Sequence, residues 1–356
     1  MSHSRLLHVE TLVPEYNYSE DEMLEACIEW VQRTNNKNII EKSTSIFKNT
    51  GIKRKNSILP SKDVIFSERN FDESNALYRK EAVRYVIEVV DMALKKTNIQ
   101  SQEIDFLVST SCTGLMSPSI NAYLINEFRM RNDIIHIPVA QVGCNGGTSG
   151  IIYVDHLLKS KPNSKALMIN LEFNSNTLQY NNYNLDNIIG TAIFADGIAC
   201  SVFENDEKKR DSLKVIDVFS HHFYDTQDIL RYDVGTTGFT LKMSKELPVF
   251  VAKNYLRIAN QFLSKHKLSI ENIDHILVHP GGIRILESVG KIIGEFGKNV
   301  NSSIKVMENY GNMSSATIMF ILRDVLDGKL KNGEKILMAS FGPGFVANFI
   351  LFEVEI

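Results

Sequence analysis

The sequence predicts an α/β protein made of two similar halves, and three observations lead to this fold class. Short apolar segments typical of buried strands alternate with amphipathic helical segments along most of the 356 residues. A helix–loop–strand pattern occurs twice, at a constant offset along the chain. A charged run between the two copies, from Glu204 to Asp211, is suited to a surface connection. We therefore expect an N-terminal half of residues 1–207 and a C-terminal half of residues 208–356.

The repeated pattern begins with a helix in each half. Apolar residues at i, i+3, i+4, i+7 and i+11 from Val83 predict a helix over 83–94, and the same spacing from Ala252 predicts one over 252–263. A short loop and an apolar strand follow, 106–108 in the first copy and 276–278 in the second. The aspartates before these strands, Asp105 and Asp274, are separated by the same offset as Val83 and Ala252. A shared offset across helix, loop and strand indicates a duplication.

The two halves also end alike. Phe194-Ala195-Asp196-Gly197 leads into an apolar strand over 198–203, and Phe341-Gly342-Pro343-Gly344 leads into one over 345–354. A glycine before a strand permits a tight turn or a close backbone approach. Each half is therefore expected to close on a buried strand.

The amino-acid composition argues against several classes of function. With 44% hydrophobic and 23% charged residues the chain is ordinary for a globular protein, and a net charge of −3 argues against a nucleic-acid binder. No apolar stretch reaches the roughly 18 residues that a membrane span needs. The cysteines form no CxxC pair, and no metal-ligand spacing is present. These features predict a soluble cytoplasmic protein without a metal site; the cysteines are Cys27, Cys112, Cys144 and Cys200.

Cys144 is the first candidate for chemistry. A predicted strand over 134–141 runs into Gly143-Cys144-Asn145-Gly146-Gly147, which opens a helical stretch through residue 158. The N-terminus of a helix carries partial positive charge and so favours a thiolate. The two glycines would let a substrate carbonyl approach the backbone. The alternative is a buried, inert cysteine at a tight turn.

His279 and Asn312 are the matching candidates in the second half. His279 follows the strand 276–278 and opens His-Pro-Gly-Gly, at the edge where α/β ligand sites usually lie. Asn312, in Tyr-Gly-Asn-Met-Ser-Ser-Ala, precedes a predicted helix over 317–326. A histidine bonded to a loop carbonyl and a helix-capping asparagine are the alternatives. However, the step from Cys144 to Asn312 agrees with the repeat offset to within one position, so the duplication predicts equivalent helix starts that face each other.

A Cys, a His and an Asn that converge in this way are suited to acyl transfer. The thiolate attacks a thioester and holds the acyl group covalently, with the imidazole as its ion-pair partner. The imidazole and the Asn amide then hydrogen-bond an oxygen on which negative charge develops. Decarboxylation of a malonyl thioester produces such an enolate. This chemistry requires no metal.

These motifs together resemble a known family. Gly-Cys-Asn-Gly-Gly at 143–147, His-Pro-Gly-Gly at 279–282, Tyr-Gly-Asn-Met-Ser-Ser-Ala at 310–316 and Phe-Gly-Pro-Gly-Phe at 341–345 are similar to the type III polyketide synthases. These are the chalcone- and stilbene-synthase-like members of the thiolase superfamily. The resemblance runs from about Phe47 to the end of the chain. Type III ketoacyl carrier-protein synthases share the Cys-His-Asn set but carry His-Gln-Ala-Asn in place of His-Pro-Gly-Gly.

The resemblance implies the five-layered αβαβα thiolase fold, a homodimer and no prosthetic group. It implies Cys144 as nucleophile, with His279 and Asn312 as the decarboxylation pair and oxyanion donors. The starter would be an acyl-CoA and the extender malonyl-CoA. Repeated condensation would be followed by lactonisation, Claisen or aldol closure to an alkylpyrone, resorcinol or phloroglucinol type of product.

The resemblance also marks residues of the substrate pocket. Phe194 matches an aromatic gatekeeper between the CoA tunnel and the active site. The second gatekeeper is usually Phe, but here Gly-Phe-Thr-Leu ends in Leu241, which suggests a wider passage and an aliphatic starter. The remaining pocket positions, for which ordinary packing or hydrogen bonding is the alternative, are Cys112, Thr113, Glu172, Thr177 and Ser314.

Coenzyme A carries phosphates, so a basic rim is expected at the tunnel mouth. The best cluster is Lys53-Arg54-Lys55, although such triplets are more often solvated surface. Arg284, just after the Pro-Gly-Gly turn, is the second candidate.

Two other functions stay open from the sequence. One is a carrier-protein-dependent ketoacyl synthase that makes a single condensation, which would need a basic patch for the acidic carrier. The other is a non-catalytic thiolase-fold protein that binds acyl groups. The intact Cys, His and Asn set argues against the latter, because a binding module needs no such set.

Overall fold

The computed structural model describes residues 3–60, 68–206 and 211–356. Within them, nine strands form one continuous sheet in the order β11-β12-β13-β8-β1-β7-β6-β4-β5. These strands are β1 (Arg5–Leu12), β4 (Phe106–Thr110), β5 (Ile135–Val139), β6 (Lys165–Phe173), β7 (Asp196–Glu204), β8 (Ser212–His222), β11 (His275–Val278), β12 (Lys335–Gly342) and β13 (Val346–Glu355). Two strand pairs lie outside it, β2 (Tyr16–Ser19) with β3 (Arg54–Ser57), and β9 (Leu230–Gly235) with β10 (Gly238–Met243).

The strand order shows two similar halves related about the β1–β8 pair. Outward from β1 the strands run β7, β6, β4 and β5, and outward from β8 they run β13, β12 and β11. In the first half β7 pairs with β1 in antiparallel fashion, and in the second half β13 pairs with β8 in the same way. The outer pairs β4–β6 and β11–β12 are parallel. This is the arrangement that a duplicated α/β unit produces.

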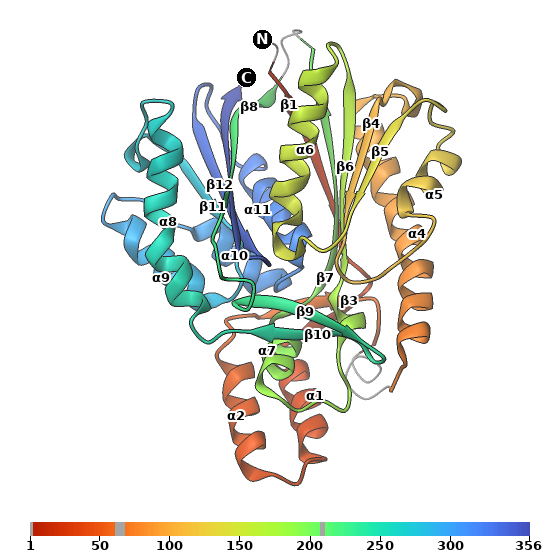
Figure 1. The fold of residues 1–356 in the computed structure, drawn as a ribbon, viewed down its shortest axis with the longest axis vertical. Helices are drawn as coiled ribbons and strands as arrows, with labels where there is room; N and C mark the ends of the chain where they lie inside the picture. Colours follow the sequence, from red (N-terminus) through yellow and green to blue (C-terminus); the bar gives the residue numbers. More distant parts are fainter. Residues whose placement is uncertain (1–2, 61–67, 207–210) are drawn as a thin grey trace.

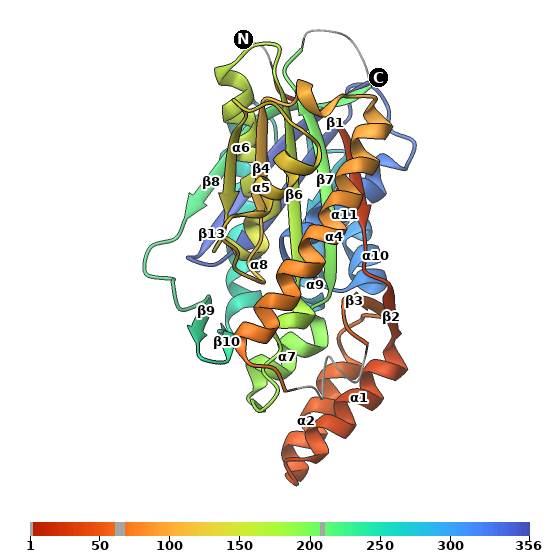
Figure 2. The same cartoon turned by 90° about the vertical axis from the view of Figure 1, so that its right-hand side faces the viewer.

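Helices cover the sheet in layers (Figure 1). Helices α6 and α11 lie between the two halves, α4 and α5 lie outside the first half, and α8 and α9 lie outside the second. Helices α1 and α2 project from one end (Figure 2). The helices are α1 (Glu20–Gln32), α2 (Lys37–Lys48), α4 (Phe71–Thr97), α5 (Ile120–Glu127), α6 (Gly146–Ser160), α7 (Leu185–Ile193), α8 (Leu247–Ser264), α9 (Ile283–Gly294), α10 (Asn301–Tyr310) and α11 (Thr317–Leu326).

Alternating side chains of the strands divide between the layers. In β6, Met168 enters the central core around α6 and α11, whereas Ile169 packs into the outer core under α4. In β12, Met338 and Leu337 divide in the same way between the central core and the outer core under α8. Because successive strand residues point to opposite faces, strands covered on both sides are apolar throughout. The five-layered αβαβα fold that the sequence predicts is therefore confirmed.

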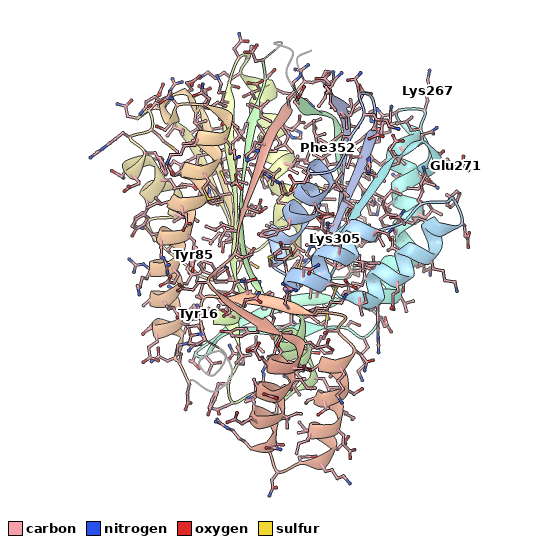
Figure 3. The ribbon with its side chains drawn as sticks, turned by 180° about the vertical axis from the view of Figure 1, so that it is seen from behind. Tyr16, Tyr85, Lys267, Glu271, Lys305 and Phe352 are labelled. Atoms are coloured by element: carbon pink, nitrogen blue, oxygen red, sulfur yellow. The ribbon has the colours of Figure 1, made fainter. Side chains whose placement is uncertain are left out.

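The outer layers lie on opposite flanks. Figure 3 shows Tyr85 of α4 on one flank and Glu271, after α8, on the other, with Phe352 of β13 between them. The ring of Tyr85 meets Phe173 of β6 with ring centroids 5.9 Å apart, and the ring of Tyr255 in α8 lies 5.8 Å from a phenylalanine ring of β13. Each outer helix is thus fixed to its sheet by aromatic contacts.

The predicted elements are present, most of them with longer bounds, although β5 is shorter than the strand expected over 134–141. The helix expected over 83–94 is the inner part of α4, which starts earlier because Asn70 and Glu73 form a reciprocal capping box. The helix over 252–263 lies within α8, and the helix over 317–326 is α11. The first residues of β4 and β11, Phe106 and His275, are separated by the offset that the repeat requires. The boundary between residues 207 and 208 falls outside the described residues and stays a proposal.

Candidate active site

The turn that carries Cys144 is built by close backbone contacts. After β5 the chain passes through Gly143, at φ +52°, into a single 3-10 turn, Gly143–Asn145, and then into α6. A Cβ at Gly143 would lie 2.8 Å from Cδ of Pro343, so glycine is required here for both conformation and space. Cys144 is partly exposed and faces a cavity.

The two glycines after Cys144 serve packing rather than substrate access. A Cβ at Gly146 would lie 2.5 Å from Cβ of Ser315, and one at Gly147 would lie 2.3 Å from Cγ2 of Ile318. Both positions face the start of α11, not the cavity. The expectation that they let a substrate approach the backbone is therefore replaced by a steric reason: the helix starts of the two halves meet here.

His279 follows β11 at the carboxyl end of the sheet. Its backbone N–H donates to the carbonyl of Ala339 at 2.9 Å, and the residue is only 3% exposed. Within the described part of the chain, neither ring nitrogen has a hydrogen-bond partner. The imidazole is thus not the carbonyl-bonded histidine of the alternative interpretation. Burial lowers the pKa of His279 to about 3, so the ring is neutral at physiological pH.

Asn312 is held by the backbone of the other half. Its N–H donates to the carbonyl of Ile193 at 2.8 Å, and its own carbonyl accepts the N–H of Ala195 at 2.9 Å. Its side-chain Oδ1 accepts the N–H of Ser314 at 2.8 Å. This oxygen thus caps the following turn, as expected of an asparagine before a helix. With the oxygen occupied, the amide NH₂ of Asn312 is the group that hydrogen-bonds the sulfur of Cys144.

One cavity brings the predicted residues together. It spans about 600 Å³, including the space open to solvent. Six of the residues singled out in the sequence line it: Cys144, His279, Asn312, Ser314, Phe194 and Leu241. Aliphatic side chains form another part of its wall, and they include Leu230, Met243, Leu247, Val251 and Ile285.

The resting thiol is protonated. Burial raises the pKa of Cys144 to about 12, and hydrogen bonds from Ser314 and Asn312 oppose that shift. The helix N-terminus therefore does not make a thiolate by itself, contrary to the simplest expectation. A thiolate requires transfer of the proton, and the neutral imidazole of His279 lines the same cavity and is free to accept it.

The chain is similar in sequence to a family of known enzymes. Residues 12–229 match the family model described as FAE1/Type III polyketide synthase-like protein, and residues 218–354 match the C-terminal domain of chalcone and stilbene synthases. A Bacillus subtilis (strain 168) protein named after chalcone synthase is 30% identical over 98% of both chains. The chain belongs to the type III polyketide synthase family. Like other members it is an acyltransferase that performs decarboxylative condensation.

Solved structures agree with this membership. The 1,3,6,8-tetrahydroxynaphthalene synthase of Streptomyces coelicolor A3(2) superimposes with a TM-score of 0.92, covering 99% of both chains at 27% identity. PKS-I of the brown alga Ectocarpus siliculosus gives a TM-score of 0.90 at 25% identity, covering 99% of this chain and 98% of that chain. The phloroglucinol synthase of Pseudomonas fluorescens is 26% identical over 86% of this chain and 87% of its own.

Behind the thiol of this polyketide synthase lies a buried carboxyl. Glu172 accepts the N–H of Cys112 and the hydroxyl of Thr113, both at 3.1 Å, and the hydroxyl of Ser315. The sulfur of Cys112 lies 3.4 Å from the hydroxyl oxygen of Ser314, which also bonds Cys144. Burial raises the pKa of Glu172 to about 7, opposed by these hydrogen bonds. A chain of polar groups thus connects Glu172 to the thiol of Cys144.

Two of the predicted pocket residues line a separate cavity. Thr113 and Thr177 face a space of about 230 Å³ beside Phe239. Thr113 also accepts the N–H of Phe173 at 2.9 Å, and Thr177 donates to the carbonyl of Asn174 at 2.8 Å. Both are engaged in local hydrogen bonding next to the catalytic cavity.

The basic residues expected to hold CoA have different surroundings. Lys53 forms an ion pair with Glu308 at 2.9 Å. Arg54 lines a surface groove that also contains Lys305 and Asp324. Arg284 is exposed in the first turn of α9, three residues after Gly281, which lines the catalytic cavity. Of the three candidates, Arg284 is nearest the catalytic cavity along the chain.

Sequence reasoning missed part of the cavity wall. Tyr232 of β9 lines it, and burial raises the pKa of its phenol. Phe341, Pro343 and Phe345 also line it. The Phe-Gly-Pro-Gly-Phe motif indicates these three residues, because the duplication makes this motif the counterpart of the segment that contains Phe194. Nothing in the pattern around Tyr232 marks that residue.

Two further observations concern ligands and membranes. In residues 3–60, 68–206 and 211–356, no group of three or more His, Cys, Asp or Glu side chains is arranged to hold a metal ion. None of the helices in the described ranges has the length and apolarity needed to cross a membrane.

Proposed function

We propose that this chain loads an acyl-CoA starter on Cys144, extends it with malonyl-CoA, and cyclises the chain to an alkylpyrone, resorcinol or phloroglucinol type of product. The observation that carries this proposal is the single cavity lined by Cys144, His279 and Asn312. A thiol, a neutral imidazole positioned as a base and an amide NH₂ are the groups that decarboxylative acyl condensation uses.

In the loading step, Sγ of Cys144 attacks the carbonyl carbon of the starter thioester. The imidazole of His279 accepts the thiol proton, and the carbon–sulfur bond to CoA breaks. The proton then passes to the departing CoA sulfur. Neither ring nitrogen of His279 has a hydrogen-bond partner in the described structure, so a nitrogen lone pair is available for the thiol proton.

In the extension step, malonyl-CoA loses CO₂ and the electron pair becomes an enolate. The amide NH₂ of Asn312 and an N–H of His279 hydrogen-bond the enolate oxygen. The enolate carbon attacks the acyl carbonyl on Cys144, and the carbon–sulfur bond to the enzyme breaks. The extended chain leaves on CoA, and the thiolate of Cys144 is regenerated for the next cycle.

We infer that the preferred starter is aliphatic. Leu241 stands where the family usually has a second aromatic gatekeeper, and it lies with Phe194 against Gly190 of α7. Aliphatic side chains, among them Leu247, Val251 and Ile285, line the cavity beside the aromatic rings of Tyr232, Phe341 and Phe345. Relatives named for tetrahydroxynaphthalene, phloroglucinol and α-pyrone synthesis support the range of products that we propose.

We also propose a homodimer. Strand β5 is the edge of the sheet on one side, and Ile135 at its start is 54% exposed. An exposed apolar edge strand is a surface that pairs with another chain. Pairing of two β5 strands about a twofold axis would cover it. Light scattering on the purified protein tests this, and a monomer at micromolar concentration would contradict it.

The test of function is incubation of the purified protein with a panel of acyl-CoA starters plus malonyl-CoA, with products identified by mass. We expect aliphatic starters to give products that contain two or more malonyl-derived units. In a second set of reactions, the same starters are supplied as thioesters of an acyl carrier protein. Turnover from the carrier protein alone, or one condensation only, would instead indicate a ketoacyl carrier-protein synthase.

A further inference from the structure

Lys55 is the last residue of the basic run 53–55, but it does not join the rim. It lies on β3, opposite Tyr18 of β2, and its side chain is directed into the protein. Its Nζ donates to the backbone carbonyl of Thr191 at 2.6 Å and to that of Phe194 at 3.2 Å. A lysine predicted to belong to the surface thus has its ammonium group on two main-chain oxygens.

Those two carbonyls belong to the end of α7. The last carbonyls of a helix have no partner within the helix and carry partial negative charge, which a lysine ammonium satisfies. Phe194 is the residue at which the chain leaves α7, with an extended conformation of φ −77° and ψ 146°. Lys55 therefore bonds the backbone at the point that sets the direction of the Phe194 side chain.

A buried carboxylate accompanies this ammonium. Asp196 accepts the N–H groups of Ile58 and Ser175, both at 2.8 Å, and the hydroxyl of Ser175. Its charge attracts that of Lys55, and Cys27 of α1 is the other titratable group that acts on the lysine. Burial lowers the pKa of Lys55 to about 8 and raises that of Asp196 to about 6, so both are charged near pH 7. Through its bond to Ile58, the residue after β3, Asp196 connects this strand to the segment that follows α7.

The same segment holds Asn312 on its other side. Ile193 accepts the backbone N–H of Asn312, and the Asn312 carbonyl accepts the N–H of Ala195. Phe194 lines the catalytic cavity and also a second cavity of about 470 Å³, which Lys55 lines too. Residues 193–195 therefore lie between the ammonium of Lys55 and the backbone of Asn312.

We propose that Lys55 is a positioning residue for the condensation reaction: it fixes the backbone of Phe194 and, through the shared bridge at residues 193–195, the amide of Asn312. This inference rests on the proposed function, since it concerns the alignment of groups that the function uses. Lys55 itself touches no reacting atom. It acts by holding the segment that separates the two cavities.

The test uses Lys55→Met, which keeps the aliphatic stem and removes the donors, and Lys55→Arg, which keeps donors and charge. Lys55 borders the second cavity, so the longer side chain of arginine lies next to space that protein atoms do not fill. Lys95→Met is the matched control, because Lys95 is an exposed lysine paired with Asp91 on α4. In every variant the fraction of protein that acyl-CoA acylates at Cys144 is measured first. The rate is then divided by the concentration of acylatable protein, so that unfolded protein does not lower the value of kcat.

We expect Lys55→Met to lower kcat for malonyl-CoA decarboxylation about tenfold or more per acylatable thiol, because small misplacements of a catalytic group cost large factors in rate. KM for malonyl-CoA should change by less than about twofold, since Asn312 acts on charge that develops in the transition state. Lys55→Arg should recover most of the rate, and Lys95→Met should match the wild type.

Several outcomes would overturn the proposal. An unchanged kcat in Lys55→Met is one, and a Lys55→Arg variant that acylates fully but turns over no faster than Lys55→Met is another. Should Lys55→Met fail to fold, Lys55→Gln, which retains one donor group, takes its place with the same criteria. Failure of the proposed function is distinct, because the wild type would then neither acylate Cys144 nor decarboxylate malonyl-CoA.

Discussion

The starts of α6 and α11 are matching positions in the two halves that have acquired different chemistry. A single 3-10 turn precedes each helix, Gly143–Asn145 in one half and Ser314–Ala316 in the other. Cys144 and Ser315 each lie two residues before the helix begins. Yet Cys144 is partly exposed to the catalytic cavity, whereas Ser315 is fully buried and donates its hydroxyl to Glu172.

The duplication therefore produces matching backbone frameworks in the two halves, but only one of the matching residues lies at the cavity. The cavity lies on one side of the contact between the two helix starts, so only one of the matching residues can face it. The second half contributes instead through Asn312, three residues before Ser315, on the segment bridged to Phe194. The proposed nucleophile and the proposed oxyanion donor thus come from neighbouring but non-equivalent places of the repeat.

The largest expected effect separates these two positions directly. Cys144→Ala should abolish acyl-enzyme formation, because no other residue is proposed to hold the acyl group. Ser315→Ala should retain acylation and lose about 1–3 kcal/mol of unfolding free energy, since a buried hydrogen bond is lost. Intact mass after treatment with acyl-CoA measures the first, and denaturant unfolding measures the second. Labelling that persists in Cys144→Ala would contradict the nucleophile assignment.

The next effect concerns Asn312. Asn312→Ala should slow malonyl-CoA decarboxylation about 10²–10³-fold, the usual cost of removing one oxyanion donor. Loading of the starter on Cys144 should remain, because the thiol and His279 are intact. CO₂ release measured beside intact mass separates the two steps. Equal decarboxylation in the variant and the wild type would refute the role of Asn312.

The sequence predicts the duplication and its offset, but not the exact pairing of residues between the two helix starts. The spacing of Asp105 and Asp274 predicted the correct offset because β4 and β11 both follow a short 3-10 turn in each half. The offset is not kept at the next turn. The 3-10 turn of the second half begins at Ser314, two positions later than the residue that the same offset pairs with Gly143. The second half has α9 and α10 where the first has α5 and β5, so exact equivalence of Cys144 and Asn312 could not hold.

Single side chains show the limit more clearly. Cys144, His279 and Asn312 follow strands or precede helices whose positions the apolar pattern predicts, so their convergence could be inferred. Lys55 could not be distinguished from Lys53, since both belong to one basic run and only the packing of β3 against α7 decides which turns inward. The direction of a side chain on a short edge strand depends on tertiary contacts that composition does not contain.

A third prediction concerns the carboxyl that connects the two helix starts. Burial raises the pKa of Glu172 from an ordinary 4.5 to about 7, so between these pH values the folded protein holds a proton that the unfolded chain has released. The stabilisation is complete below about pH 4.5 and is lost as the pH rises through 7, and it amounts to at most about 3 kcal/mol. Glu172→Gln should flatten the pH dependence of the unfolding free energy between about pH 4.5 and 7. A slope equal to that of the wild type would contradict this assignment.

The smallest expected effect tests the contact between the halves itself. A Cβ at Gly147 would lie 2.7 Å from the backbone oxygen of Ser315, and backbone cannot move as a flexible side chain can. Gly147→Ala should therefore cost about 1–3 kcal/mol, as overpacking does. Gly294→Ala is the matched control in a helix, because no described atom lies within 4 Å of its Cβ, and it should be neutral or stabilising by up to about 1 kcal/mol. Denaturant unfolding measures both, and equal stability of the two variants would mean that α6 and α11 do not meet as closely as the comparison requires.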